Sequence, residues 1–419
     1  MRDPLRRRWF AAATLVAAVA VLVAGGLLIN SGAEHQRGTV ITASSSSSSM
    51  TSAPPPTTVT STPSSSTPAT TPAAPTPALP APARQVFGAN VNLLFNTPGL
   101  ADSVIATQLR ALRATAATVA RSDAFWEATE PTAPVAGAHH YDWTFDDRIA
   151  GALAAAGLRW LPILDYTAPW AQSIPGQDHS PPRSAADYAA YAGVFAARYG
   201  SGGAFWAAHP ELTAEPVQTI EIWNEPDNGE FWTRTPDATA YADLYAAARL
   251  AIDAADPGVR VIVGGLTRPT EFLPAMLAAR PALAGHIDGV GVHPYGTPAV
   301  VAAKLEADRR ALTAVGLGAV PLYATEFGWT TSPPGALDYV PAPTRPRYIR
   351  RTLDELDGGR CGVATALLYT WYSPEQNPAD SQQWYGVNAP AGARTADSGA
   401  FAAAVHSAAT APVRARSCG

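Results

Sequence analysis

The sequence predicts a (β/α)8 barrel on the strength of three observations. Eight strand-like segments, each followed by a helix-like segment, fill the chain from Gln85 onward. That region has about 330 residues, within the range of a single barrel of this kind. No Gly-rich phosphate loop follows the first strand, which makes a doubly wound open sheet the weaker interpretation.

Each predicted strand is a short run of apolar and β-branched residues, and each predicted helix has apolar residues three and four positions apart. The expected strands are Gln85–Asn92, Thr118–Ser122, Arg159–Asp165, Val217–Trp223, Arg260–Gly264, Ile287–Val292, Pro321–Thr325 and Ala364–Tyr369. The expected helices are Asp102–Leu112, Thr144–Ala156, Ser184–Arg198, Thr239–Ala255, Thr270–Arg280, Ala299–Val315, Arg345–Leu356 and Asp397–Ala408.

The composition allows a large core and excludes some functions. Of the 419 residues, 47% are hydrophobic and 15% are charged. The formal net charge of -5 gives no reason to expect a nucleic acid as partner. Two cysteines, Cys361 and Cys418, are too few for a disulfide scaffold and badly spaced for a zinc site. We expect no metal and no cofactor.

Residues 1–33 are typical of an export signal or a membrane anchor. Four arginines within the first eight residues precede an apolar run from Trp9 to Ile29. The run is longer than the apolar part of most cleavable signals and close to the roughly 20 residues that span a bilayer. A transmembrane helix over residues 9–29 and a signal cleaved near residues 31–33 both remain open. In either case we expect the rest of the chain outside the cell, at its surface or secreted.

Residues 34–84 are predicted to be a disordered linker. Between Ala43 and Ala83 the chain is almost entirely Ser, Thr, Pro and Ala, without the apolar period that a core requires. This composition is typical of an O-glycosylated stalk or of a plain flexible spacer. The folded domain is therefore expected to cover residues 85–419.

Two glutamates follow predicted strands directly. Asn224-Glu225-Pro226 ends the fourth strand, because Pro226 has no N–H to donate and keeps the preceding residue extended. Glu326 ends the seventh strand. Carboxyl ends of barrel strands are where barrel enzymes carry catalytic groups. Glycosidic-bond cleavage needs two carboxyl groups, one as acid and one as nucleophile or base. Glu225 and Glu326 are the predicted catalytic pair.

These motifs resemble clan A of the retaining glycoside hydrolases, most closely families 39 and 5 and cellulase-like bacterial proteins. The matching segments are Asn224-Glu225-Pro226, Thr325-Glu326-Phe327-Gly328-Trp329, His293-Pro294-Tyr295, Arg121, Trp126, Tyr141-Asp142-Trp143 and Trp371. The resemblance implies that Glu225 is the acid/base and Glu326 the nucleophile. Family 39 xylosidases usually carry an additional β-domain, which this sequence does not show after its eighth strand, and this argues against a xylosidase.

Four further polar residues are expected to serve the substrate site. Arg121 and Tyr295, where they reach Glu326, would favour its charged form. Asn224 is expected to hydrogen-bond the 2-hydroxyl group of the sugar. The resemblance implies that His293 hydrogen-bonds near the same sugar, with a buried core histidine as the alternative.

Three more acidic residues receive other interpretations. Glu221 lies four positions before Glu225 on the same strand face, so we expect a buried ion pair with Arg121. Glu127 and Glu130 follow the second strand and are expected to be solvated loop charges, with sugar contact as the alternative.

Tryptophans near strand ends are candidate platforms for sugars, whose apolar faces stack on wide aromatic rings. They are Trp126, Trp170, Trp232, Trp329 and Trp371, of which Trp126 and Trp371 are the predicted substrate contacts and core packing is the alternative. His139-His140 has no third ligand at a useful spacing, so packing at a helix entry is favoured over metal binding.

A disulfide between Cys361 and Cys418 is also expected. Cys361 precedes the last strand and so lies at the amino end of the barrel, and the last helix returns the chain to that end. The short tail from Thr410 to Ser417 can bridge the remaining gap. Exported proteins occupy compartments in which disulfides persist.

Together these features predict an exported, monomeric retaining glycosidase or endo-glycanase that acts on β-linked oligo- or polysaccharide. Carbohydrate is the expected partner, and the membrane is a second one if the N-terminal helix is kept. A transglycosylase that remodels cell-wall or capsular glycan would use the same residues. A catalytically inactive glycan-binding barrel is the alternative from a different class, although an intact glutamate pair argues against it.

Overall fold

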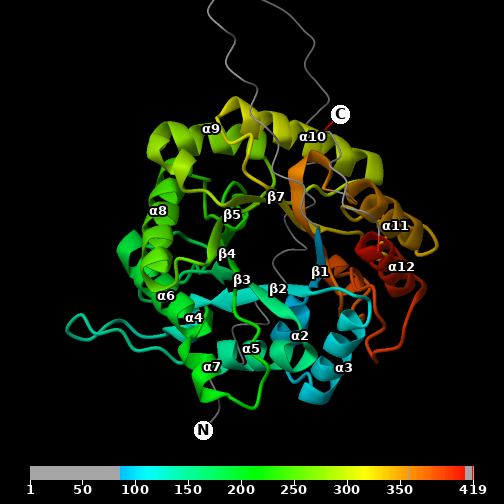
Figure 1. Ribbon diagram of the computed structural model, residues 1–419, viewed down its shortest axis with the longest axis horizontal. Coiled ribbons are helices and arrows are strands. Elements are labelled where there is room, and N and C mark those ends of the chain that lie inside the picture. The colour runs from blue at the N-terminus through cyan, green and yellow to red at the C-terminus, as the bar shows by residue number, and fades with distance from the viewer. Residues whose placement is uncertain (1–84, 358, 411–417, 419) are drawn as a thin grey trace, which may run out of the picture. The chain divides into compact units, whose positions relative to one another are not determined.

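The computed structural model describes residues 85–357, 359–410 and 418. Eight parallel strands form a closed barrel in which each strand pairs with its neighbours in sequence and β8 pairs with β1. Helices surround the barrel (Figure 1). The predicted (β/α)8 fold is confirmed. The predicted signal or anchor over residues 1–33 and the linker over residues 34–84 lie outside the described residues. Within the described part, no helix combines the length and the hydropathy that crossing a bilayer requires.

The strands follow the predicted order with small shifts at their ends. They are β1 (Val86–Asn90), β2 (Val119–Phe125), β3 (Arg159–Asp165), β4 (Thr219–Asn224), β5 (Arg260–Leu266), β6 (Gly289–Val292), β7 (Leu322–Phe327) and β8 (Val363–Leu368). The first strand is shorter than predicted because the helix α2 (Asn92–Asn96) begins directly after it. The second continues to Phe125, beyond its predicted end at Ser122.

The interior of the barrel changes from apolar to polar along its axis. Toward the amino ends of the strands, one buried cluster consists of Val119, Leu161, Ile262, Tyr323 and Leu367. Successive residues of a strand alternate between its two faces, so Arg121 and Asp123 share the inward face of Val119 on β2. Charged side chains therefore lie inside the barrel toward the carboxyl ends of the strands.

The helices cover the outside of the barrel. Besides α2 they are α3 (Asp102–Arg113), α4 (Trp126–Thr129), α5 (Thr144–Ala156), α6 (Ala185–Tyr199), α7 (Ala204–Ala208), α8 (Ala238–Ala255), α9 (Pro269–Ala279), α10 (Pro298–Ala314), α11 (Arg345–Leu356) and α12 (Ala396–Thr410). Short 3-10 helices are η2 (Pro281–Gly285), η3 (Arg360–Gly362) and η4 (Ser381–Trp384).

Buried tyrosines attach two of these helices to the strands beneath them. Tyr188 of α6 donates a hydrogen bond to the carbonyl oxygen of Leu164 in β3 (2.5 Å). Tyr241 of α8 donates to the carbonyl oxygen of Ile222 in β4 (2.8 Å). Asp237 caps α8 by accepting from the backbone N–H groups of residues 239 and 240. These contacts fix the outer layer behind β3 and β4.

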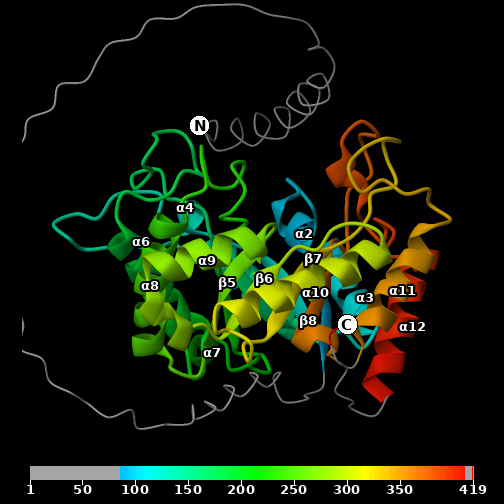
Figure 2. The same ribbon diagram turned by 90° about the horizontal axis from the view of Figure 1, so that it is seen from above.

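Long connections follow the carboxyl ends of five strands. They are residues 126–143, 166–184, 225–237, 328–344 and 369–395, which follow β2, β3, β4, β7 and β8. Figure 2 shows such loops on the same side of the barrel as α2 and α4, with α7 on the opposite side. This end is therefore the one that can carry a substrate site.

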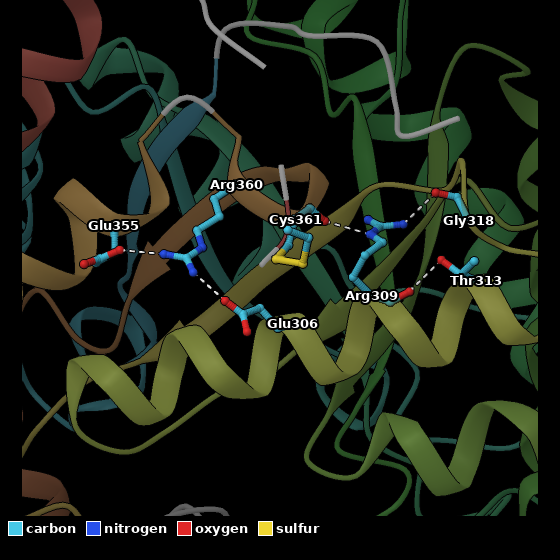
Figure 3. The surroundings of a disulfide bond; sticks show 8 residues. Glu306, Arg309, Thr313, Gly318, Glu355, Arg360 and Cys361 are labelled. Atoms are coloured by element: carbon cyan, nitrogen blue, oxygen red, sulfur yellow. Dashed lines mark hydrogen bonds and ion pairs between the residues drawn. A yellow bond between two sulfur atoms is a disulfide. The ribbon is translucent and has the colours of Figure 1, made fainter. Parts of the chain in front are cut away.

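The opposite end carries a disulfide between Cys361 and Cys418, as the sequence predicts (Figure 3). The Cα atoms of the two cysteines are 4.4 Å apart, and 57 positions separate them in sequence. Cys361 is buried within η3, directly before β8.

Two arginines hold the turn that contains this cysteine. Arg309 of α10 donates from Nε to the carbonyl oxygen of Cys361 (2.7 Å). Arg360 forms ion pairs with Glu306 of α10 and with Glu355 of α11. Figure 3 shows Arg309 and Arg360 on opposite sides of Cys361, with Arg360 directed toward Glu306 and Glu355. The turn thus has polar anchors besides the sulfur bridge.

Candidate active site

Arg121 of β2 is the centre of a buried polar network at the carboxyl end of the barrel. Its Nε donates to Oε2 of Glu221 (2.6 Å), and its Nη1 donates to Oε1 of Glu326 (2.5 Å). The same Nη1 also donates to Oδ1 of Asn90 (2.8 Å), and Nη2 donates to Oδ1 of Asn224 (3.1 Å). One guanidinium on β2 thereby binds side chains from three other strands, β1, β4 and β7.

The charge of Arg121 is balanced by two carboxylates. Burial alone would lower the pKa of Arg121, but the neighbouring Glu221 and Glu326 carboxylates raise it above its ordinary value. The expected ion pair between Arg121 and Glu221 is confirmed, and both of its side chains are fully buried. Glu221 thus supports the site from inside the barrel, because its carboxylate orients the guanidinium.

Glu326 lies near the end of β7 and is held by two donors. Arg121 occupies Oε1, and the hydroxyl group of Tyr295 donates to Oε2 (2.7 Å). Burial alone would raise the pKa of Glu326, but the charges of His293 and Arg121 and the hydrogen bond from Tyr295 lower this pKa below its usual range. Both Arg121 and Tyr295 therefore reach Glu326, as expected, and keep it ionised.

Glu225 is the first residue after β4 and has different neighbours. Its Oε1 is 2.7 Å from Nδ1 of His293, and its Oε2 accepts from Nδ2 of Asn228 (2.7 Å). Its φ angle of 45° lies in the left-handed region that non-glycine residues rarely adopt. Asn228 also donates its backbone N–H to the Glu225 carbonyl oxygen (2.9 Å), which closes a turn. The backbone after β4 is thus constrained where it presents Glu225.

His293, just past β6, lies between the two glutamates. Its Nδ1 is 2.7 Å from Glu225 and 3.7 Å from Oε2 of Glu326. Burial alone would lower the pKa of His293, but Glu326 and the hydrogen bond with Glu225 raise it. The contact between Nδ1 of His293 and Glu225 fixes the position of both side chains, whichever of the two carries the proton. The Nε2 atom has no hydrogen-bonding partner among the described residues.

The two glutamates and His293 form one compact group. One carboxylate oxygen of Glu225, one of Glu326 and one ring nitrogen of His293 lie within 4.8 Å of one another. Such a trio offers ligand types that a metal ion accepts. Each of the four carboxylate oxygens already has a hydrogen-bonding partner in the protein, so the arrangement fits proton transfer and nucleophilic attack better than metal binding.

The structure does not place Trp126 and Trp371 as sugar platforms. Trp126 is 0% exposed, and its indole N–H donates to Oε2 of Glu130 (2.8 Å). Trp371 is 1% exposed, donates to the carbonyl oxygen of Gln108 (3.0 Å) and packs edge-on against Phe401 of α12. Neither ring has an open face for stacking. The prediction that these two residues contact the substrate is wrong. Both are core residues, which was the alternative interpretation.

Two tyrosines that directly follow strands were missed by the sequence analysis. Tyr369 directly follows β8, is half-buried, and its ring centroid is 6.3 Å from that of Tyr295. Tyr166 directly follows β3, and its hydroxyl accepts from Nδ2 of Asn224 (3.4 Å). The ring of Phe231, from the loop after β4, stacks beside Tyr166 at 14°. Tyr166 directly follows one predicted strand and Tyr369 is the last residue of another, and these positions were the available signal.

The acidic residues after β2 differ from their predicted state. Glu130 is fully buried rather than solvated, because the helix α4 directs it inward against Trp126. Its Oε1 is 2.6 Å from Nδ1 of His139. Glu127 is half-buried. His139 therefore serves as a partner of a buried carboxylate, in agreement with packing over metal binding.

Solved structures share this barrel. A monomeric beta-xylosidase from Caulobacter crescentus CB15 matches with a TM-score of 0.60 and 22% identity, over 78% of this chain and 68% of that one. A GH39 enzyme from Xanthomonas axonopodis pv. citri matches with a TM-score of 0.59 and 21% identity, over 78% and 67%. A GH5_18 enzyme from Bifidobacterium longum matches with a TM-score of 0.58 and 10% identity, over 79% and 80%.

No protein-family model and no curated protein matches the sequence. At these identities the likeness to solved structures concerns the fold. The chain has the same fold as these solved glycoside hydrolases, which is the fold that the resemblance of the sequence motifs implies.

Proposed function

We propose that the protein is a retaining glycoside hydrolase that cleaves β-linked oligo- or polysaccharides. The pairing of Glu225 with Glu326 carries this proposal. One oxygen of each carboxyl group lies within 4.8 Å of one of the other. Retaining pairs are about 5–5.5 Å apart, whereas inverting pairs are about 6.5–9.5 Å apart to leave room for a water molecule. The solved barrels similar to this chain include enzymes described as a beta-xylosidase and a GH39 enzyme.

In the first step Glu326 attacks the anomeric carbon while Glu225 donates a proton to the leaving oxygen. The glycosidic C–O bond breaks, a bond to Oε of Glu326 forms, and the leaving group departs as an alcohol. The lowered pKa of Glu326 supports the nucleophile role, because the carboxylate is ionised before attack. The contact between His293 and Glu225 supports the acid role, because it holds the carboxyl group in place.

In the second step Glu225 takes a proton from water, and the resulting oxygen attacks the anomeric carbon. The bond to Glu326 breaks, and the sugar leaves with its original configuration. Glu225 is protonated again, so the enzyme returns to its starting state. Arg121 and Tyr295 stabilise the Glu326 carboxylate as it leaves.

Aromatic residues on one side of Glu225 support a subsite for the leaving group. Tyr166, His179 and Phe231 lie in the loops after β3 and β4, with ring centroids of Tyr166 and His179 4.1 Å apart. Asn224, the residue before Glu225, contacts this cluster because its Nδ2 donates to the hydroxyl group of Tyr166. Aromatic faces bind the apolar faces of sugars.

We propose that the protein works outside the cytoplasm, secreted or attached to the membrane by its N-terminal segment. The disulfide between Cys361 and Cys418 supports this location independently of the N-terminal sequence, because disulfides persist in oxidising compartments.

A substrate screen with an anomer assay tests the function. The full chain is incubated with aryl β-glycosides and with cell-wall, capsular and plant polysaccharides. NMR then identifies the anomer formed first from the best substrate. We expect the β-anomer first, and an initial α-anomer contradicts the retaining mechanism. Binding of a glycan without any turnover supports the inactive-barrel alternative and overturns the enzymatic proposal.

A further inference from the structure

A second carboxyl group lies on the nucleophile's side of the site, held by two amides. Asp123 follows Arg121 by two positions on β2 and shares its inward face. Its Oδ1 accepts from Nδ2 of Asn92 (2.7 Å), and its Oδ2 accepts from Nδ2 of Asn96 (2.7 Å). Both asparagines belong to the short helix α2, where four positions apart is one turn. The Asp123 carboxyl group is therefore fixed in orientation.

The neighbourhood of Asp123 has hydrogen-bond acceptors without donors. Oδ1 of Asn92 and both carboxyl oxygens of Asp165 are buried and have no hydrogen-bonding partner among the described residues. Asp165 ends β3 and is 0% exposed. It lies four positions after Leu161, which faces the barrel interior, so it points inward as well. Buried acceptors without donors cost free energy, so this cluster suits a ligand that brings O–H or N–H groups.

The charges around the cluster favour a neutral ligand. Burial raises the pKa of Asp123 and, together with the charge of Asp123, raises that of Asp165. The positive charge of Arg121 acts on both groups and lowers these pKa values in part. Because these pKa values are raised, protons rather than a cationic ligand can neutralise the two acids. Neutral hydroxyl groups can then supply the donors.

The position identifies the part of the substrate involved. Arg121, two residues before Asp123, contacts the proposed nucleophile Glu326, whose target is the anomeric carbon of the glycone. The proposed acid Glu225 has its contacts on another side, with His293 and Asn228. Asp123 therefore lies with the groups that surround the glycone rather than the leaving group.

We propose that Asp123, oriented by Asn92 and Asn96 and backed by Asp165, binds two neighbouring hydroxyl groups of the glycone and determines which sugar the enzyme accepts. Each Asp123 oxygen already accepts one hydrogen bond and retains acceptor capacity for a second. Two hydroxyl groups on adjacent ring carbons match the two oxygens of one carboxylate. This inference rests on the proposed function, since it assigns a role within the same site.

Deoxy analogues of the best aryl β-glycoside test the inference on the full chain. Each ring hydroxyl is replaced by hydrogen in turn, and kcat/KM is measured for the wild type and for Asp123→Asn. We expect two adjacent deoxy positions to lower the wild-type kcat/KM by about 10-fold or more each. For Asp123→Asn, we expect kcat/KM with the parent glycoside to fall by a similar factor. Removing either of the two hydroxyl groups from the substrate should then lower kcat/KM of this variant little further. Equal deoxy penalties in wild type and variant overturn the proposal.

Two further variants keep the test interpretable. Asn96→Ala removes one amide that orients Asp123 and leaves the carboxyl group, and we expect the same two deoxy penalties to shrink. Asp102→Asn alters an exposed acid on α3, whose side chain is 82% exposed, and is expected to change neither kcat/KM nor the penalties. Thermal unfolding of each variant reveals any loss that comes from misfolding. Deoxy penalties that persist in Asn96→Ala and Asp123→Asn alike overturn the proposal.

Binding measurements separate this inference from the proposed function. Calorimetry with the free monosaccharides, their deoxy analogues and the corresponding amino sugars does not require turnover. Binding that depends on two adjacent hydroxyl groups and on Asp123 supports the subsite even if no glycoside is cleaved. Tighter binding of an amino sugar that Asp123→Asn abolishes shows a cation site and overturns the hydroxyl assignment. Turnover of the parent with no deoxy penalty leaves the glycosidase function standing and overturns the subsite.

Discussion

Nη1 of Arg121 donates a 2.5 Å hydrogen bond to Oε1 of Glu326, joining β2 to β7 across the interior of the barrel. The same guanidinium binds Glu221 on β4, so one cation neutralises a structural and a proposed catalytic carboxylate. A buried carboxylate without such partners would be protonated near neutral pH. The contact therefore connects the packing of the barrel interior with the ionisation of the proposed nucleophile.

Tyr295→Phe is expected to move the acid limb of kcat/KM to higher pH. The wild-type pKa of Glu326 is lowered in part by the Tyr295 hydroxyl, and loss of this donor raises it. The ionised nucleophile then disappears at a higher pH as the solution is acidified. By linkage, the lowered pKa stabilises the fold above the pKa of an unfolded Glu and loses this contribution as the pH falls through the folded value. A pH profile with an activated aryl glycoside measures the shift.

Tyr245→Phe provides the control for that profile. Tyr245 of α8 is also buried, and its hydroxyl donates to the carbonyl oxygen of Val261 (2.8 Å). Its loss is expected to lower stability by about 1 kcal/mol without moving the acid limb. A profile that shifts equally in both variants would show that Tyr295 acts through stability alone.

Glu225→Ala is expected to affect poor leaving groups far more than activated ones. An alkoxide needs a proton to depart, which general acid catalysis accelerates by about 100- to 10,000-fold, whereas a dinitrophenolate departs without one. Added azide should restore turnover and give the β-glycosyl azide, because the small anion reaches the space of the missing side chain.

Two further variants accompany Glu225→Ala. Glu326→Gly should show no measurable turnover of either substrate type, because no nucleophile remains. Glu211→Ala, at a side chain that is 65% exposed, should behave as the wild type. If Glu225→Ala loses activity equally with both types of leaving group and does not respond to azide, a residue other than Glu225 is the acid.

The fold and the glutamate pair were predictable because their signals are local. Alternating strand and helix patterns imply the barrel, and Asn224-Glu225-Pro226 stops a strand by the chemistry of proline. The contact of His293 with Glu225 joins residues 68 positions apart and depends on the register of two strands. No local pattern contains it.

Side-chain direction beyond a strand end was the part that sequence patterns could not supply. Alternation between faces holds only while the strand lasts, and β8 ends at Leu368. Tyr369 stays beside Tyr295, whereas Trp371 turns outward to Phe401 of α12. Large aromatic residues occur in helix-strand interfaces as readily as in sugar sites. Residue type alone therefore led to the wrong prediction that Trp371 binds the sugar.

Gly265→Ala is expected to displace His293 and thereby to weaken its contact with Glu225, the proposed acid. A Cβ atom at Gly265 of β5 would lie 1.9 Å from Nε2 of His293, so the buried ring must move. Its hydrogen bond to Glu225 is then lost or lengthened. We expect kcat/KM to fall about 10-fold or more for alkyl leaving groups and less for activated aryl ones.

Gly285→Ala is the matched control for that substitution. A Cβ atom at Gly285 would have nothing within 4 Å, so activity and melting temperature should stay near the wild-type values. An unchanged leaving-group dependence in a folded Gly265→Ala variant would argue against a role of His293 in holding Glu225.

The double substitution Cys361→Ser with Cys418→Ser is expected to lower stability and to leave the substrate site intact. The disulfide closes a loop of 57 positions, for which loop entropy gives about 4 kcal/mol at most. The bond lies at the amino end of the barrel, away from Glu225 and Glu326, so kcat and KM of the folded variant should match the wild type. Arg309 still donates to the Cys361 carbonyl oxygen, which keeps the turn before β8 in place. Denaturant unfolding with and without reductant measures the effect, and the double variant serves as its own control because reductant cannot act on it. A wild type that is as stable in reductant as without it would show that polar contacts and packing alone close this end of the barrel.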